Sequence, residues 1–487
     1  MMCYDCIVVG KGAIGLSIIF HLLQKGVKVL CIDDSPRYID AMASFASGAM
    51  LGAISELSHL NLLGDMEEEA FIEARKYHLQ FQKSISEKSG SSYEIKDGLF
   101  VIAGGYGGEQ DFAELNHQIE ICKKYNIKFD HVLPSEIPGF KPTTYTGIEK
   151  SVFFNFDGTI NSGEFMACID YSISTFSKQK YSFIQDNILQ IEKTENTYFV
   201  KCNSGNYLCT NHIIFSTGAF YHNIQDTILS NNEKKIVLYS GRGVGLHLSK
   251  IKGLTNGIRT PNRDFACGLH LLPNDSTTYL GATNRFTPSP NEIEKHPYVN
   301  EHQFLINSSI QELNSNILQS SHLKSVVGYR PLSIDRRPIV GRLNDGLWIA
   351  NGTYRNGMLL APLIGMEISN AIFENIEPRK YWNTNRKLMS EFRNPEFLTN
   401  ESWVANVKSE MVHHVSKRKD IFNTTLGNER QKAEEFCDFV YKEVFCSDNN
   451  ELSNKHFQEA YKLFQDAPIR ENVPRVLNFL LSEYNWK

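Results

Sequence analysis

Three glycines near the amino terminus, Gly10, Gly12 and Gly15, have the spacing of a turn that holds phosphate groups. Gly10 permits a tight turn, Gly12 lets the backbone approach a pyrophosphate, and Gly15 lets a helix pack closely on a strand. We assign Ala13 and Ile14, which begin that helix, to the same site, because the free N–H groups of a helix N-terminus attract phosphate. Such a glycine pattern alone is weak evidence, since glycines also serve ordinary turns.

The elements around this turn strengthen the prediction. The apolar run at 6–10 predicts a buried parallel strand, and the helix after it carries apolar residues on the side that would face a sheet: Ile14, Ile18, Leu22 and Ile19. Gly26 ends the helix, and residues 27–32 predict a second strand. Asp33 and Asp34 follow it, where a carboxylate can accept hydrogen bonds from a ribose diol. This order predicts a Rossmann unit that binds a dinucleotide, either FAD or NAD(P).

A run of mostly small residues at 43–52 comes shortly after the second strand. Small side chains there would let backbone amides and hydroxyls lie against a large flat cofactor. The candidates in this run are Ser44, Ser47, Gly48 and Ala49. The alternative is a flexible loop before a helix.

Further segments match one known set of motifs in the same order along the chain. They are SGAMLGA at 47–53, GLFV at 98–101, DGTIN at 157–161, IIFSTGAF at 213–220 and GAT at 281–283. The most specific are GYRP at 328–331, followed by Asp335 and PIVG at 338–341, and GTYRNGMLLAP at 352–362. On these segments, residues 4–380 resemble the D-amino-acid-oxidase-like flavoproteins, in particular the glycine oxidase branch of thiamine biosynthesis.

The resemblance implies an α/β fold with two domains. A discontinuous, Rossmann-type FAD-binding domain would span 1–80, 150–230 and 325–377. An inserted α+β substrate domain with an antiparallel sheet would span 81–149 and 231–324. A length of 487 residues suits two or three domains. Residues 378–487 lie beyond the resemblance and show apolar residues at helical spacing, which predicts an α-helical C-terminal extension. It would be a docked appendage, a lid, a dimer contact or a partner surface.

The resemblance also implies a cofactor and a reaction. The cofactor is FAD, held non-covalently, because no cysteine follows Arg330 in the manner of covalent sarcosine oxidases. The implied reaction oxidises a small amino acid or amine, glycine- or sarcosine-like, by hydride transfer to flavin N5, and the imine hydrolyses while O₂ becomes H₂O₂. The further cofactor-binding residues are Ile188, Thr217, Gly218, Arg330, Tyr354, Arg355, Asn356, Gly357, Met358, Leu359 and Met50.

Four residues are expected at the substrate end. The planar guanidinium of Arg330 suits a substrate carboxylate, although an arginine also serves structural ion pairs. Arg355 lies in a glycine-flanked turn before a helix, where backbone N–H groups could stabilise negative charge on the reduced flavin. Met50 would lie on the substrate side of the flavin, or simply in the core. His270 stands where the family has a substrate-side tyrosine, and it is equally compatible with hydrogen bonding, proton relay or a core position.

Two more departures from the family motifs weaken glycine itself as the substrate. Thr353 replaces a frequent histidine, and Ala49 replaces a glycine. Three functions therefore stay open. The first is an FAD oxidase, including one for a larger amino-acid-derived substrate. The second is a dehydrogenase with a quinone or protein acceptor, and the third is an NAD(P)-binding or non-catalytic protein.

The charge, the apolar runs and the cysteines of the chain argue against other classes of protein. A net charge of −5 gives no reason to expect nucleic acid or an anionic membrane as a partner. No apolar run approaches the length of about 20 residues that a transmembrane helix needs, and no signal peptide precedes the first strand, so a cytoplasmic protein is expected. The CxxC pair Cys3 and Cys6 could suggest zinc or a redox pair, but buried, reduced thiols are favoured for the ten cysteines. His413-His414 is too isolated to indicate a metal site.

Overall fold

The computed structural model describes residues 2–34, 42–58, 65–104, 107–143, 149–221, 224, 236, 238–262, 268–287, 296–333 and 337–384. Apart from residues 286 and 287, all of these belong to one compact unit. The expected α-helical extension lies outside the described residues from 385 on, and so does Asp335 of the family motif. Within the described ranges, no helix has the length and apolarity needed to cross a bilayer.

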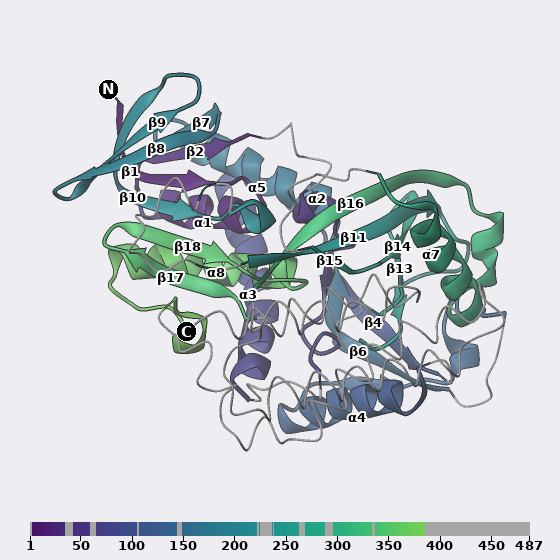
Figure 1. Cartoon of the computed structure of the whole chain (residues 1–487). Coiled ribbons are helices and arrows are strands. Elements are labelled where there is room, and N and C mark those ends of the chain that lie inside the picture. The colour runs from purple at the N-terminus through teal and green to yellow at the C-terminus, as the bar shows by residue number, and fades with distance from the viewer. Residues whose placement is uncertain are drawn as a thin grey trace, which may run out of the picture. The chain divides into compact units, whose positions relative to one another are not determined.

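The first of two sheets contains the predicted Rossmann unit (Figure 1). Its strand order is β17 (Ile339–Asn344), β18 (Leu347–Asn351), β10 (Tyr207–Phe215), β1 (Met2–Val9), β2 (Val29–Asp33) and β7 (Tyr181–Gln185). Strands β18, β10, β1, β2 and β7 are parallel, and β17 is antiparallel to β18. Strand β9 (Thr197–Cys202) pairs with β10 and with β8 (Ile188–Thr194). The strand–helix–strand order read from 6–33 is therefore confirmed.

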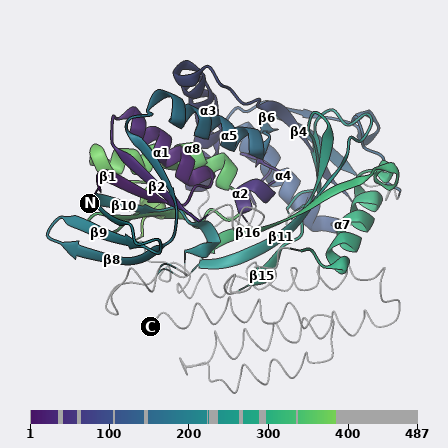
Figure 2. The same ribbon diagram turned by 90° about the horizontal axis from the view of Figure 1, so that it is seen from above.

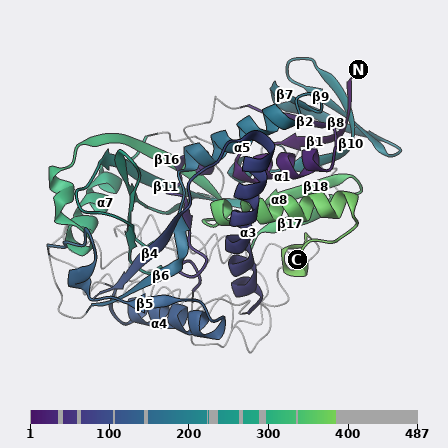
Figure 3. The ribbon, with the colours of Figure 1, turned by 180° about the vertical axis from the view of Figure 1, so that it is seen from behind.

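Four helices lie together along one face of this sheet, and the β8–β9 hairpin extends on the other side (Figure 2). They are α1 (Ala13–Gln24), α3 (Asp65–Ser89), α5 (Ser162–Phe176) and α8 (Gly357–Phe373). Helix α3 runs across α8 and beside α5, as the view from behind shows (Figure 3). Because α8 packs against α1, α1 is buried around nearly its whole circumference, Ser17 included. The expectation of a single buried face was too narrow for this helix.

The second sheet has the order β11 (Leu238–Ser249), β14 (Thr277–Gly281), β13 (His270–Pro273), β12 (Gly257–Arg259), β4 (Lys96–Ala103), β6 (Lys150–Thr159) and β3 (Met50–Leu51). Strand β16 (His322–Ser333) pairs with β11 along almost its whole length, and β5 (Phe129–His131) pairs with β6. The other elements are α2 (Ala43–Ala46), α4 (Gly108–Lys124), α7 (Val299–Glu312), β15 (Arg285–Thr287) and short 3₁₀ helices at 134–136, 218–220, 315–319 and 380–382. The pairs are antiparallel, as expected, except that β12 is parallel to β4.

These sheets confirm the α/β fold class, and the domain boundaries given above stay a prediction. Met50 and Leu51 join the second sheet by pairing with β6 although they follow the Rossmann segment in sequence. The small-residue run therefore passes from one sheet to the other. This crossing places residues 43–50 beside both sheets.

The cysteine prediction is wrong for one pair. Cys3 and Cys209 form a disulfide, because β1 and β10 are neighbouring parallel strands that place these two residues opposite each other, with their Cα atoms 4.5 Å apart. The sequence alone did not show that these strands are neighbours. Cys6 is a buried free thiol outside this pair, so Cys3 and Cys6 of the CxxC pattern are not bonded to each other. The other described cysteines, Cys31, Cys122, Cys168 and Cys202, are buried and free, as expected.

Gly365 marks the crossing of α8 over α1 and supports a first prediction. A Cβ atom there would lie 2.7 Å from the backbone carbon of Ser17. Gly365→Ala should therefore push the helices apart and lower the free energy of unfolding by about 1–3 kcal/mol in urea titrations. Gly163→Ala is the matched control. Gly163 lies in the first turn of α5, and a Cβ atom there would lie 3.4 Å from its nearest neighbour, Oδ1 of Asn161. The control should change stability by less than about 0.5 kcal/mol, and equal losses in both variants would contradict the packing argument.

Candidate functional site

The glycine turn brings the start of α1 very close to strand β1. A Cβ atom on Gly15 would lie 2.0 Å from the carbonyl oxygen of Gly10, and one on Gly10 would lie 2.5 Å from that of Ser216. Gly10 also has a φ of +105°, which a glycine adopts without strain. Gly12 caps α1, whose first turn has no acidic side chain, so its N–H groups present positive potential. This arrangement fits a dinucleotide pyrophosphate.

The acids after β2 lie beside the same turn. The carboxylate of Asp33 accepts a hydrogen bond from the backbone N–H of Lys11 at 2.6 Å. The carboxylate of Asp34 accepts one from the side-chain amide of Asn187, also at 2.6 Å. Ser44 reaches the turn from the small-residue run, where its hydroxyl accepts from the N–H of Ala13 at 3.1 Å. The parallel strands thus deliver the predicted phosphate-binding and ribose-binding groups to one edge of the sheet.

A cavity of about 510 Å³ opens at this edge and continues to the second sheet. Nearly all of the predicted site residues line it: Gly10, Gly12, Ala13, Ile14, Asp33, Asp34, Ser44, Ser47, Gly48, Ala49, Met50, Ile188, Thr217, Gly218, His270, Arg330, Tyr354, Arg355, Gly357 and Met358. Three do not. Gly15 is closed in against Gly10, Asn356 is the residue before α8, and the side chain of Leu359 is buried in the helix core.

The small-residue run is held between the two sheets. Tyr279 of β14 donates a hydrogen bond from its hydroxyl to the carbonyl of Ala46 at 3.0 Å. A Cβ atom on Gly48 would lie 2.8 Å from the side chains of both Tyr279 and Leu272. Ala49, where the family motif has glycine, has a φ of +53°, the left-handed conformation that glycine adopts most easily. Ala49 therefore adopts a backbone conformation that suits the glycine of the motif.

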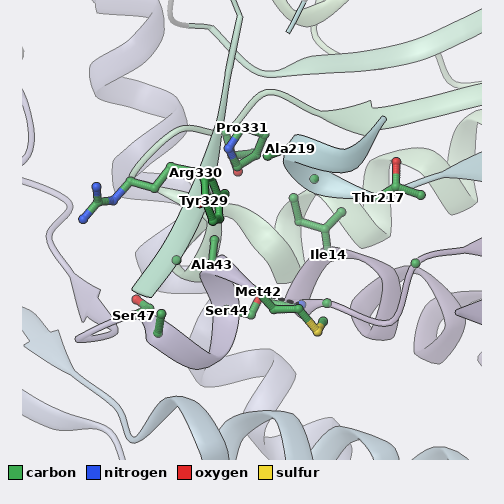
Figure 4. Close-up of a pocket in the computed structure, with 18 of the residues that line it drawn as sticks. Ile14, Met42, Ala43, Ser44, Ser47, Thr217, Ala219, Tyr329, Arg330 and Pro331 are labelled. Atoms are coloured by element: carbon green, nitrogen blue, oxygen red, sulfur yellow. Dashed lines mark hydrogen bonds between the residues drawn. The ribbon is translucent and has the colours of Figure 1, made fainter. Parts of the chain in front are cut away.

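Arg330 extends from β16 on the side of the cavity opposite to Thr217 (Figure 4). Its Nη1 donates hydrogen bonds to the carbonyl of Thr283 and to Oδ1 of Asn284, each at 3.2 Å. A Cβ atom on Gly243 would lie 2.2 Å from Nη1, so the guanidinium lies flat on the backbone of β11. Among the described residues, no carboxylate lies within 4 Å of Arg330. Its positive charge is therefore available to an anion in the cavity.

A buried ionic cluster that the sequence did not predict forms another wall of the cavity. Glu56 forms ion pairs with Arg259 and, at 3.4 Å, with Arg355, and Asn262 donates to Glu56 at 3.3 Å while accepting from Arg259 at 2.5 Å. Burial would raise the pKa of Glu56, but the two arginine charges and these hydrogen bonds lower it to about 2. Glu56 is therefore a permanent anion and cannot serve as a base near neutral pH.

His270 begins β13 and lines the cavity with 5% of its surface exposed. Its ring stacks on Tyr279, and its Nδ1 lies 3.0 Å from the carbonyl of Gly268. A carbonyl can only accept, so Nδ1 carries the proton and Nε2 has a lone pair. Burial, assisted by the charge of Arg259, lowers the pKa of His270 to about 4. The imidazole is thus neutral near pH 7, which disfavours a role in proton relay.

Metal chemistry receives no support from the part of the chain that the structure describes, which holds no group of three potential ligands. His413-His414 lies outside the described residues.

Comparison with known proteins identifies the family. A family model described as FAD dependent oxidoreductase matches residues 5–371. The chain belongs to this family. FAD is therefore the cofactor, which decides between the FAD and NAD(P) that the glycine pattern left open. The enzyme is an oxidoreductase.

Individual relatives are similar at low identity. The curated glycine oxidase of Geobacillus kaustophilus (strain HTA426) is 22% identical over 382 residues, which cover 76% of this chain and 93% of that protein. The crystal structure of glycine oxidase from Geobacillus kaustophilus matches with a TM-score of 0.67 and 18% identity, over 79% of this chain and 99% of that one. Iminodiacetate oxidase from Chelativorans sp. BNC1 matches with a TM-score of 0.63 and 16% identity, over 77% and 96%. These structures share the fold.

The buried cluster supports a prediction on the pH dependence of stability. Since folding lowers the pKa of Glu56 to about 2 from an unfolded value of about 4.3, its carboxylate stabilises the fold fully above the unfolded value. This stabilisation is lost as the pH falls toward the folded value. Glu56→Gln should lower the free energy of unfolding at pH 7 by about 3 kcal/mol. The gap from wild type should narrow below about pH 4, as measured by urea unfolding at several pH values.

Glu120→Gln is the control for this prediction, because among the described residues Glu120 forms only an exposed ion pair with Lys123 on α4. It should change stability by less than about 1 kcal/mol at any pH. A gap between Glu56→Gln and wild type that stays constant down to about pH 3 would show that folding does not lower the pKa of Glu56.

Proposed function

We propose that this FAD-dependent oxidoreductase oxidises a small amino acid or related amine that carries a carboxylate, with O₂ as the final acceptor. The observation that carries the proposal is Arg330, whose guanidinium faces the cavity without a carboxylate partner among the described residues. A planar guanidinium binds both oxygens of a carboxylate. The relatives named glycine oxidase and iminodiacetate oxidase support the same substrate class.

The proposed reaction balances without a further reactant. The amino acid, O₂ and water give the 2-oxo acid, ammonia and H₂O₂; the substrate C–N bond is oxidised to an imine, which water hydrolyses. Bound FAD supplies the two-electron acceptor for this bond. The protein holds the reacting carbon in place, which is a large part of catalysis when the cofactor carries the chemistry.

The residues at the glycine turn would hold the cofactor. The first N–H groups of α1 and the backbone at Gly12 suit the pyrophosphate, and Asp33 suits the ribose. The run at Ser47–Met50 would lie along the flavin. The start of α8, at Gly357, has no acidic residue in its first turn, so its N–H groups suit negative charge on the flavin. We expect the cofactor to be bound non-covalently.

The substrate end would then be defined by Arg330, His270 and Met50. Arg330 binds the carboxylate. The lone pair on Nε2 of neutral His270 can accept a hydrogen bond but cannot donate one, so it suits an N–H of the substrate amine. Met50 is half-buried and offers an apolar contact. Arg355 would shape the turn next to the cofactor rather than bind substrate, because it pairs with Glu56.

We further expect a cytoplasmic location. Residues 378–487 are expected to contribute a lid, a dimer contact or a partner surface, and from 385 on they lie outside the described residues.

A substrate screen with the purified holoenzyme tests the function. The panel is glycine, sarcosine, iminodiacetate and the D- and L-amino acids, with flavin bleaching read without air and H₂O₂ read under air. We expect both signals from the same compounds. Bleaching without peroxide would replace O₂ by another acceptor and identify a dehydrogenase. No bleaching by any compound with a carboxylate and an amine would contradict the substrate class.

Arg330→Ala should lower kcat/KM for the best substrate by about a hundredfold, because the substrate carboxylate loses its charged partner. Arg330→Lys should recover only part of it, since an ammonium lacks the fork of donors. FAD content should stay unchanged in both. Arg342→Ala, which removes an arginine of β17 outside the cavity, should behave as wild type. Unchanged kinetics in Arg330→Ala would refute the anchor.

A further inference from the structure

Asn284 links the predicted substrate anchor to the turn beside the cofactor. It follows β14, two residues after Ala282, which lines the cavity. Its Oδ1 accepts a hydrogen bond from Nη1 of Arg330 at 3.2 Å, and its Nδ2 donates one to the hydroxyl of Tyr354. Tyr354 and Arg330 come from segments that are far from Asn284 in sequence. One amide therefore joins three parts of the chain.

The chemistry of the partners fixes how this amide is oriented. An arginine can only donate hydrogen bonds, so the amide oxygen of Asn284 must face Arg330 and its NH₂ group must face Tyr354. Two glycines of β11 make room for the group. A Cβ atom on Gly241 would lie 3.0 Å from Oδ1 of Asn284 and 3.1 Å from the ring of Tyr354. A Cβ atom on Gly243 would lie against the guanidinium of Arg330.

The hydrogen bonds of Arg330 are divided unequally. Nη1 donates to the carbonyl of Thr283 and to Asn284, and both acceptors are neutral. No described residue accepts a hydrogen bond from Nη2 or Nε of Arg330. The guanidinium is thus held by one nitrogen, while the opposite edge, Nη2 and Nε, keeps the paired N–H geometry that binds a carboxylate.

We propose that Asn284 is a positioning residue that fixes the guanidinium of Arg330 for the substrate carboxylate and, through Tyr354, ties it to the turn beside the flavin. This inference rests on the proposed function. Asn284 suits the task because an amide orients a guanidinium without neutralising it. A carboxylate at this place would pair with Arg330 and compete with the substrate.

The substitution Asn284→Asp separates positioning from a merely structural role. Aspartate has the same shape, can accept from Arg330 and can accept from the hydroxyl of Tyr354, so a structural role predicts near wild-type behaviour. The proposed role predicts the opposite, because the new charge would occupy the anchor. Asn284→Ala removes the hydrogen bonds and adds no charge.

The experiment measures binding of acetate to the holoenzyme from the visible spectrum of bound FAD, together with KM and kcat for the best substrate. We expect Asn284→Ala to weaken acetate binding and raise KM by about tenfold, and Asn284→Asp to do so by about a hundredfold. The kcat of Asn284→Ala should fall much less than its KM rises. Asn316→Asp is the control, because the side chain of Asn316 accepts a hydrogen bond from the exposed Lys141 and Asn316 does not line the cavity. This variant should match wild type.

The proposal would be overturned if Asn284→Asp bound acetate as tightly as wild type does. It would also be overturned if Asn284→Ala bound acetate more weakly than Asn284→Asp. Tyr354→Phe provides a second route if a variant at 284 fails to fold. As a single variant, Tyr354→Phe should weaken acetate binding by about threefold. Added to Asn284→Ala, it should cause no further loss, because both substitutions break the same connection between Tyr354 and Arg330. Additive losses of acetate affinity in the double variant would contradict the connection from Tyr354 through Asn284 to Arg330. If wild type and Arg330→Ala bind acetate equally, the proposed function fails instead, whatever position 284 shows.

Discussion

The approach of α1 to β1 is the contact on which the rest of the site depends. With hydrogen in place of a side chain at Gly10 and Gly15, the helix begins almost in contact with the strand. The free N–H groups of its first turn therefore lie at the carboxyl edge of the sheet, beside Asp33 and Thr217. Any Cβ atom at Gly15 would move the helix away from these groups. The groups that suit a dinucleotide come from separate elements, and they would then no longer lie close together.

The site also depends on one segment of the chain that passes between the two sheets. Residues 43–50 leave the Rossmann unit, lie under Tyr279 and enter the second sheet as β3. Because the run carries small side chains, both sheets approach it closely. The cavity can therefore combine phosphate-binding groups from one sheet with Arg330 and His270 from the other. The edge of one sheet alone would not supply both kinds of group.

Sequence patterns predicted the parts of the site that are local. The glycine turn and the acid after β2 each depend on neighbours within a few residues or on a recognisable motif. The close packing of Gly15 is of this kind. The motif at 352–362 predicted the start of α8 in the same way, because a glycine-flanked turn before an apolar run is a local signal.

The parts that were missed depend on contacts between distant segments. Glu56 and Arg259 are 203 positions apart, and the pairing of β12 with β4 and β13 brings the arginine to the cavity. The disulfide between Cys3 and Cys209 likewise depends on which strands are neighbours. Asn284 carried no motif, and a polar residue after a strand is common. No periodicity in the sequence reveals such pairs.

The buried ionic cluster has a consequence for how the enzyme would respond to acidity. Glu56 stays charged down to about pH 2 and His270 stays neutral down to about pH 4. Arginine side chains keep their charge throughout. These walls of the cavity therefore present a constant electrostatic field over the whole physiological range. Near neutral pH, neither Glu56 nor His270 would change its charge. For the proposed reaction, the protonation of the arriving amine would then be a source of pH dependence that lies outside these two residues.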